Sequence, residues 1–209
     1  MTQPIPVSSD VAFTPTVKAI QTRKGSRTAY ARMEASGGWK TTITPDLAAL
    51  ISEQTSVFLG TANAAGQPYI QHRGGPAGFL RVLDDKTIAF ADFRGNRQFI
   101  SHGNLAENPK ALLFLIDYAH RQRVKIWGEA RVAEDDPALL SHLMPENYKA
   151  RGEQVILFRV DAWDSNCPQH IPQRFEAADV ARLLDQRDRR IAELEAEIAR
   201  LSRPDASAP

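Results

Sequence analysis

One basic stretch of the sequence, "RGNRQFISHGN", carries residue types that could hold an anionic ligand. It follows an apolar run and places Arg94 and Arg97 beside a Gly-Asn turn, with a helix expected to open near residues 96–98. Backbone N–H groups at a helix start favour an anion, and guanidinium groups bind phosphate through paired hydrogen bonds. The segment predicts a phosphate cradle for a small ligand, with simple surface arginines as the alternative; its other polar residues are Asn96, Gln98, Ser101 and Asn104.

A glycine pair marks a second unusual segment, "QHRGGPAGF". Adjacent glycines weaken a strand, so Gly74 and Gly75 indicate either a bulge or a close approach of another group to the backbone. A planar or phosphorylated ligand is one group that could require such an approach.

The third segment, "SNCPQHIPQ", holds the only cysteine of the 209 residues. A zinc site normally needs three or four protein ligands, and Cys167 with His170 supplies two. A nucleophilic cysteine needs a lowered pKa, which His170 could provide, although no third member is visible. The two flanking prolines stiffen the segment, which also suits a fixed edge that lines a pocket.

Seven strand signals separated by short turns predict a mainly β protein, an antiparallel barrel or sandwich with flanking helices. The apolar or alternating runs cover residues 56–63, 68–74, a hairpin over 78–92, 111–117, 123–133 and 154–163. Helices are expected at 44–54, where Thr44 caps and Pro45 opens the helix, at about 96–108 before Pro109, and from Pro137.

The two ends of the chain differ from this central part. Residues 1–43 are rich in Pro, Ser, Thr and Gly and predict an extended N-terminal arm that could carry one short helix. Apolar residues over 176–203 alternate in steps of four and three, which is the heptad pattern of a coiled coil. We therefore expect an arm at 1–43, a barrel domain at 44–175, a coiled-coil-like helix at 176–203 and a disordered tail at 204–209.

Composition excludes several classes of protein. Lys and Arg total 26 against 25 Asp and Glu, a net charge of +1 that is unlike a globally basic nucleic-acid binder. One cysteine excludes an internal disulfide. No apolar run approaches the roughly 18 residues of a membrane span, and the N-terminus lacks the pattern of a signal peptide. We expect a cytoplasmic protein without nucleic-acid or membrane partners.

Residues 45–172 resemble the FMN-binding split-barrel family of pyridoxamine 5′-phosphate oxidase, and more closely its branch of related flavin-nucleotide-binding proteins. The resemblance rests on the order of a strand, "GNR", a helix, "NP", the strand "LLFLID" and then "RVKIWGEARV". It implies a six-stranded antiparallel split β-barrel that forms a homodimer, with FMN bound at the subunit interface.

The resemblance also implies which residues contact the flavin. Arg73 fits an arginine on the second barrel strand, and Arg123 stands in register with a glutamine of the oxidases. The stretch after the next hairpin would hold the phosphate and the ring. The full cofactor-binding set is His72, Arg73, Gly74, Gly75, Asp92, Phe93, Arg94, Asn96, Arg97, Gln98, Ser101, Asn104, Arg123, Cys167, Gln169 and His170.

The implied activity is that of an FMN-dependent oxidoreductase acting on a small molecule at the flavin face. The chain ends in "SNCPQHIPQRF" and a heptad helix instead of the segment with which the oxidase grips pyridoxine phosphate, so we expect a different substrate. No catalytic residue is fixed, with Cys167 and His170 as candidates, and no metal is expected. The alternative is a non-catalytic flavin- or haem-binding or redox-sensing module, and F420 or haem could replace FMN.

Overall fold

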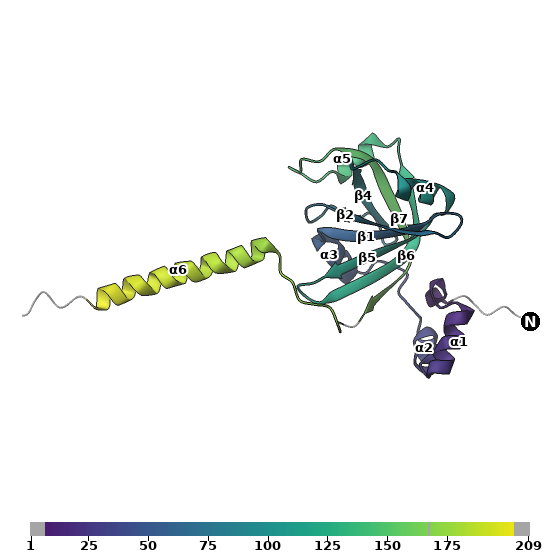
Figure 1. The fold of residues 1–209 in the computed structure, drawn as a ribbon, viewed down its shortest axis with the longest axis horizontal. Helices are drawn as coiled ribbons and strands as arrows, with labels where there is room; N and C mark the ends of the chain where they lie inside the picture. Colours follow the sequence, from purple (N-terminus) through teal and green to yellow (C-terminus); the bar gives the residue numbers. More distant parts are fainter. Residues whose placement is uncertain (1–6, 167, 203–209) are drawn as a thin grey trace, which may run out of the picture. The chain divides into compact units, whose positions relative to one another are not determined.

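The computed structural model describes residues 7–166 and 168–202. The contacts divide the chain into two compact units, one of Met1–Asp117 with Gln122–Pro168 and one of Tyr118–Arg121 with Gln169–Pro209. The first unit holds the sheet and most of the helices, and the second holds the long C-terminal helix (Figure 1).

The first unit is built on one seven-stranded sheet in the order β2-β1-β5-β6-β7-β4-β3. Every neighbouring pair is antiparallel, which confirms the predicted antiparallel β class. The barrel was expected to have six strands; the seventh is the two-residue edge strand β3. The strands are β1 (Ser56–Ala62), β2 (Pro68–Gly74), β3 (Arg81–Val82), β4 (Thr87–Phe93), β5 (Lys110–Asp117), β6 (Gln122–Ala133) and β7 (Gly152–Asn166).

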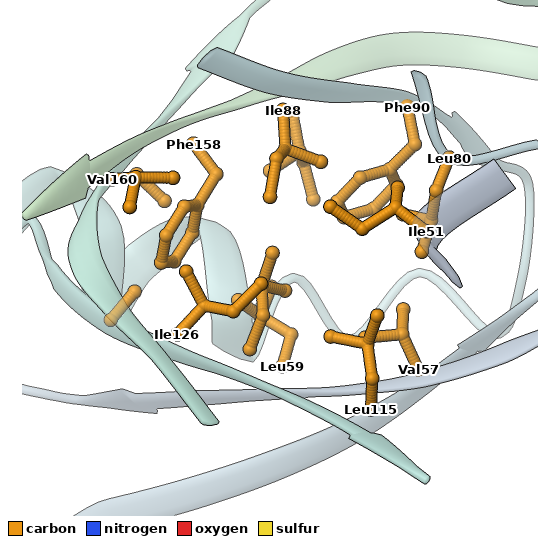
Figure 2. Packing of buried hydrophobic residues seen from close by; sticks show 14 of the residues in the cluster. Ile51, Val57, Leu59, Leu80, Ile88, Phe90, Leu115, Ile126, Phe158 and Val160 are labelled. Carbon is orange, nitrogen blue, oxygen red and sulfur yellow. The ribbon is translucent and has the colours of Figure 1, made fainter. Parts of the chain in front are cut away.

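Buried and less buried residues alternate along the strands, and the buried ones form the core. In β1 and β6 every second residue is buried, because successive side chains of a strand point to opposite faces of the sheet. Figure 2 shows Phe158 and Ile88 on one side of the core facing Ile126 and Leu59 on the other. Each such fully buried side chain stabilises the fold by about 1.5–3 kcal/mol.

Three helices flank the sheet: α3 (Pro45–Glu53), α4 (Ile100–Glu107) and α5 (Pro137–Leu143). The Thr44 side chain accepts a hydrogen bond from the backbone N–H of Leu47 and so caps α3, as predicted. Leu47 and Ile51 bury the apolar face of α3 in the core. Helix α4 begins at Ile100, later than the 96–98 expected from the sequence.

The N-terminal segment folds into short helices, so the prediction of an extended arm is wrong. Glu34 forms ion pairs with Lys18 and Arg27. Trp39 stacks on Trp127 of β6, with ring centroids 4.6 Å apart and planes inclined by 11°. Charge pairing and this aromatic contact stabilise helices in a segment whose Pro, Ser, Thr and Gly content suggested an extended arm. The elements are the 3-10 helix η1 (Ser8–Val11), α1 (Pro15–Lys24) and α2 (Arg27–Ala35).

In the second unit, helix α6 spans Ala177–Leu201, within the predicted 176–203. None of its residues is buried. Within residues 7–166 and 168–202, no helix is long and apolar enough to cross a membrane.

Candidate cofactor cleft

A polar cleft of about 240 Å³ lies where strands β2 and β4 approach helix α4. Strand β2 is one edge of the sheet, and β4 lies next to the opposite edge, so these two strands share no backbone hydrogen bonds. Tyr69, Gln71 and Arg73 alternate along β2 and line the cleft from one side. The cleft therefore occupies the opening between the two ends of the sheet.

Asp92 connects the two sides of this opening. Its Oδ1 accepts a hydrogen bond from Arg73 Nη1 in an ion pair, and its Oδ2 lies 2.7 Å from Nε2 of His102 on α4. The Asp92 side chain is only 10% exposed and that of Arg73 19%. A carboxylate this buried requires partners, and here one comes from β2 and the other from α4.

The segment between β4 and α4 has an unusual backbone. Arg97 and Phe99 adopt φ values of 57° and 54°, in the left-handed region that non-glycine residues rarely occupy. The Arg97 guanidinium lies over the Phe99 ring, 5.4 Å from its centroid. These two conformations delay the start of α4 to Ile100, and each costs of order 1 kcal/mol, a cost typical of functional segments.

Glu153 on β7 faces the arginines of this segment. Its Oε1 lies 3.6 Å from Arg94 Nε and 3.9 Å from Arg97 Nε, which is ion-pair distance. Both arginines keep about half of their side-chain surface exposed, at 48% and 54%. About half of each side chain is therefore open to solvent, and Arg97 also lines the cleft.

Seven predicted site residues line this one cleft. They are Arg73, Asp92, Phe93, Asn96, Arg97, Gln98 and Ser101. Arg94 adjoins it through Glu153. Asn104 does not reach it, because its side-chain amide donates to the Thr61 hydroxyl at 3.0 Å in the interior.

Sequence reasoning missed four cleft residues with polar side chains. Tyr69 and Gln71 could have been found from the two-residue period of a strand, since they share the face of Arg73. His102 and Glu153 gave no local signal. They come from separate elements, α4 and β7, and reach the cleft through the tertiary fold.

Several predicted residues lie away from the cleft. His72 is on the opposite face of β2 from Arg73, and its Nε2 is 2.8 Å from the Ser56 hydroxyl. A Cβ on Gly75 would come within 2.7 Å of Phe79, so the close approach that the glycine permits is to the protein's own core. Arg123 lies on the outer face of β6, opposite the buried Val124.

The cysteine segment is only partly described. Cys167 lies outside the described residues, while Gln169 and His170 are exposed and belong to the second unit. The placement of this segment beside a cofactor stays a prediction.

A second hollow, of about 600 Å³, lies between the N-terminal helices and the outer face of β6 and β7. All three tryptophans of the chain, Trp39, Trp127 and Trp163, line it. Burial raises the pKa of the Asp164 carboxyl in this hollow, while Lys125, 3.7 Å away, lowers it in part. It contains none of the residues predicted to bind a cofactor.

The chain is similar to a known protein family and to several solved structures. The family model described as pyridoxamine 5′-phosphate oxidase matches residues 43–167, more than half of the chain. A search of curated proteins finds no match. Solved structures similar to this chain include HupZ from Group A Streptococcus, with 18% identity over 64% of this chain and 99% of that one and a TM-score of 0.49.

Two further similar structures bear different descriptions. An FMN-binding protein from Syntrophomonas wolfei is 11% identical over 70% of this chain and 97% of its own, with a TM-score of 0.45. The heme storage protein HutZ from Vibrio cholerae is 18% identical over 57% and 89%, with a TM-score of 0.40.

Fold and cleft together define an antiparallel split β-barrel with flanking helices and a polar cleft at the opening of the sheet. The match over residues 43–167 shows that the chain belongs to the pyridoxamine 5′-phosphate oxidase family.

Proposed function

We propose that this protein binds FMN through the cleft and acts as an FMN-dependent oxidoreductase on a small molecule. The observation that carries the proposal is the pair Arg94 and Arg97, held half-exposed at the strained segment that opens α4. Guanidinium groups next to the backbone N–H groups of a helix start match the chemistry of a phosphate monoester.

The residues of the cleft suit the phosphate end of FMN. Arg97, Asn96, Gln98 and the Ser101 hydroxyl supply donors along one wall. Arg73 Nε is buried with no hydrogen-bond partner among the described residues, so the cleft side of the barrel has donor capacity in excess of its own acceptors. When bound, the flavin ring would supply the ability to accept and return electrons.

The size of the cleft favours a site completed by a second subunit. Small-molecule sites usually measure about 300–1,000 Å³, and this cleft measures about 240 Å³. Arg123, which the family resemblance assigns to the flavin, lies on an outer face away from the cleft of its own chain. A homodimer in which each chain provides the phosphate cleft and its partner provides Arg123 accounts for both observations.

A phosphate-bearing cofactor fits the cleft better than haem. His72 points away from the cleft, and His102 has its Nε2 engaged by Asp92, so only the Nδ1 of His102 could reach an iron there. F420 also carries a phosphate and is the alternative cofactor for this cleft. The substrate would bind at the exposed flavin face, and pyridoxamine 5′-phosphate is not favoured because the chain lacks the oxidase's closing segment.

The test is an absorbance spectrum of the purified protein, followed by mass spectrometry of the ligand released on denaturation. Flavin bands and the mass of FMN are expected. A Soret band would replace the proposal with a haem-binding function, and the mass of F420 would reassign the cofactor. Bound FMN that neither a nicotinamide cofactor nor candidate substrates reduce would contradict the oxidoreductase part. Protein that is colourless and takes up no added FMN would overturn the whole proposal.

A further inference from the structure

Helix α6 presents an apolar stripe that its own unit leaves uncovered. Val180, Leu184, Ile191, Leu194 and Ile198 retain between 42% and 62% of their surface exposed. The stripe continues to Leu201, at 69%. A single helix of 25 residues with such a narrow stripe has little to stabilise it in water, because helices depend mainly on the packing of one face.

The spacing and identity of these residues specify what covers the stripe. The heptad a positions hold Leu184, Ile191 and Ile198, and the d positions hold Val180, Arg187, Leu194 and Leu201. Isoleucine at a with leucine at d, as in the last two heptads, favours two parallel strands. We propose that α6 pairs in parallel and in register with α6 of a second copy of this chain, forming a two-stranded coiled coil.

Charges beside the stripe favour the same orientation. In a parallel pair, each g residue faces the e residue of the next heptad on the other helix. Arg190 at g then meets Glu195 at e of the second copy, twice by symmetry, and the remaining g–e pairs bring no like charges together. In an antiparallel pair e residues face each other, so the acidic Asp188 and Glu195 would repel. In the single chain Arg190 bonds Glu193 at 2.9 Å and is free to exchange partners at the surface.

Arg187 interrupts the stripe at a d position. Two arginines would meet in that layer of a parallel pair, and the e-position Asp188 of each facing helix borders the same layer. The charge is therefore compensated only when the helices are in register. A polar residue inside a heptad stripe lowers stability and fixes the register, as a buried Asn or Lys does at other positions. A slipped pair would place Arg187 against Ile191 or Leu194.

Cysteine cross-linking in the full-length chain tests this inference. Native Cys167 is first replaced by serine. Val180→Cys and Leu201→Cys then place one thiol at either end of the stripe, and Ala196→Cys places a control thiol on the outward f position. In the parallel pair both end variants form covalent dimers on mild oxidation, with a yield roughly tenfold above the control. Helical content measured by circular dichroism shows whether each variant still folds.

A mixture of the two end variants distinguishes a parallel pair from an antiparallel one. A predominant disulfide between residue 180 of one chain and residue 201 of another, found by mass spectrometry of digested dimers, would mean an antiparallel pair. Equal yields of disulfide-linked dimer at positions 196 and 201 would mean that no specific pair forms. In a separate reaction with a trivalent maleimide, a covalent product of three or more chains would mean a higher oligomer. Each of these results overturns the inference. The coiled-coil inference concerns the same homodimer as the proposed function but does not depend on the cofactor. The absorbance spectrum tests the cofactor and the cross-linking pattern tests the helix pair, so one can fail without the other.

Discussion

Arg73 of β2 and Asp92 of β4 form an ion pair across the opening of the sheet, where the backbone makes no hydrogen bonds between the two strands. The pair therefore holds together two parts of the barrel that the ladder leaves apart. It also fixes the position of Arg73 in the wall of the cleft. One interaction thus serves both the fold and the candidate site.

Asp92→Asn is expected to destabilise the protein by about 3 kcal/mol, because it leaves a largely buried guanidinium without its counter-charge. Urea unfolding followed by circular dichroism measures the change, and Asp135→Asn, at an exposed position, is the control. Equal stability of the two variants would show that the Arg73–Asp92 pair contributes little.

Arg97→Ala is expected to weaken FMN binding by roughly ten- to a hundredfold, the effect of losing one hydrogen bond to a charged group. Fluorescence titration of the apoprotein with FMN measures the affinity. Arg23→Ala, an exposed arginine on α1, should leave the affinity unchanged. An unaltered affinity in Arg97→Ala would remove this residue from the phosphate site.

Glu153→Gln is expected to tighten FMN binding by roughly three- to tenfold. The change removes a negative charge next to Arg94 and Arg97, so a phosphate in the cleft no longer meets repulsion from the Glu153 carboxylate. The same titration checks it, with the exposed Glu134→Gln as the matched control. Weaker binding would mean that Glu153 mainly orients the two arginines.

The stability of the barrel should fall in acid partly through Glu129. Hydrogen bonds from Lys110 and Arg159 lower its pKa from 4.5 to about 2. A carboxyl with a lowered pKa in the folded state stabilises the fold above about pH 4.5, and this contribution is lost as the pH falls toward 2. The effect is small, since a third of the side chain is exposed.

Unfolding of Glu129→Gln measured from pH 7 to pH 2 tests this link. The variant should be less stable than the unchanged protein at neutral pH and should converge with it in acid. Glu53→Gln, at an exposed helix position, should follow the unchanged protein throughout. A constant difference across the range would show that the effect is not electrostatic.

Trp39→Ala is expected to release the N-terminal helices from the sheet, because it removes both the stack on Trp127 and the contact with Phe13. Limited proteolysis should cleave residues 8–40 roughly tenfold faster, while the barrel stays resistant. Trp39→Phe keeps an aromatic ring and should restore most of the protection. If proteolysis is unchanged in the alanine variant, the backbone bridge between Lys40 and Trp163 must be enough to hold the segment to the sheet.

Local sequence patterns were enough to predict the antiparallel β class, the positions of most strands, the cap of α3 and the segment that carries Arg94 and Arg97. These features are local: alternation, capping residues and turn residues act over a few positions and need no partner elsewhere in the chain. The family resemblance also identified Arg73 and Asp92 as neighbours of one site, although not as partners of each other.

The residues that complete the cleft could be found only from the folded chain. His102 and Glu153 reach it from α4 and β7, and His72 turns away although it is adjacent to Arg73, because neighbouring residues of a strand face opposite sides. The folded N-terminal helices likewise depend on Trp127, which lies 88 residues beyond Trp39 in sequence. Local patterns carry no information about which distant side chains will meet, since that depends on the strand order and register of the whole sheet.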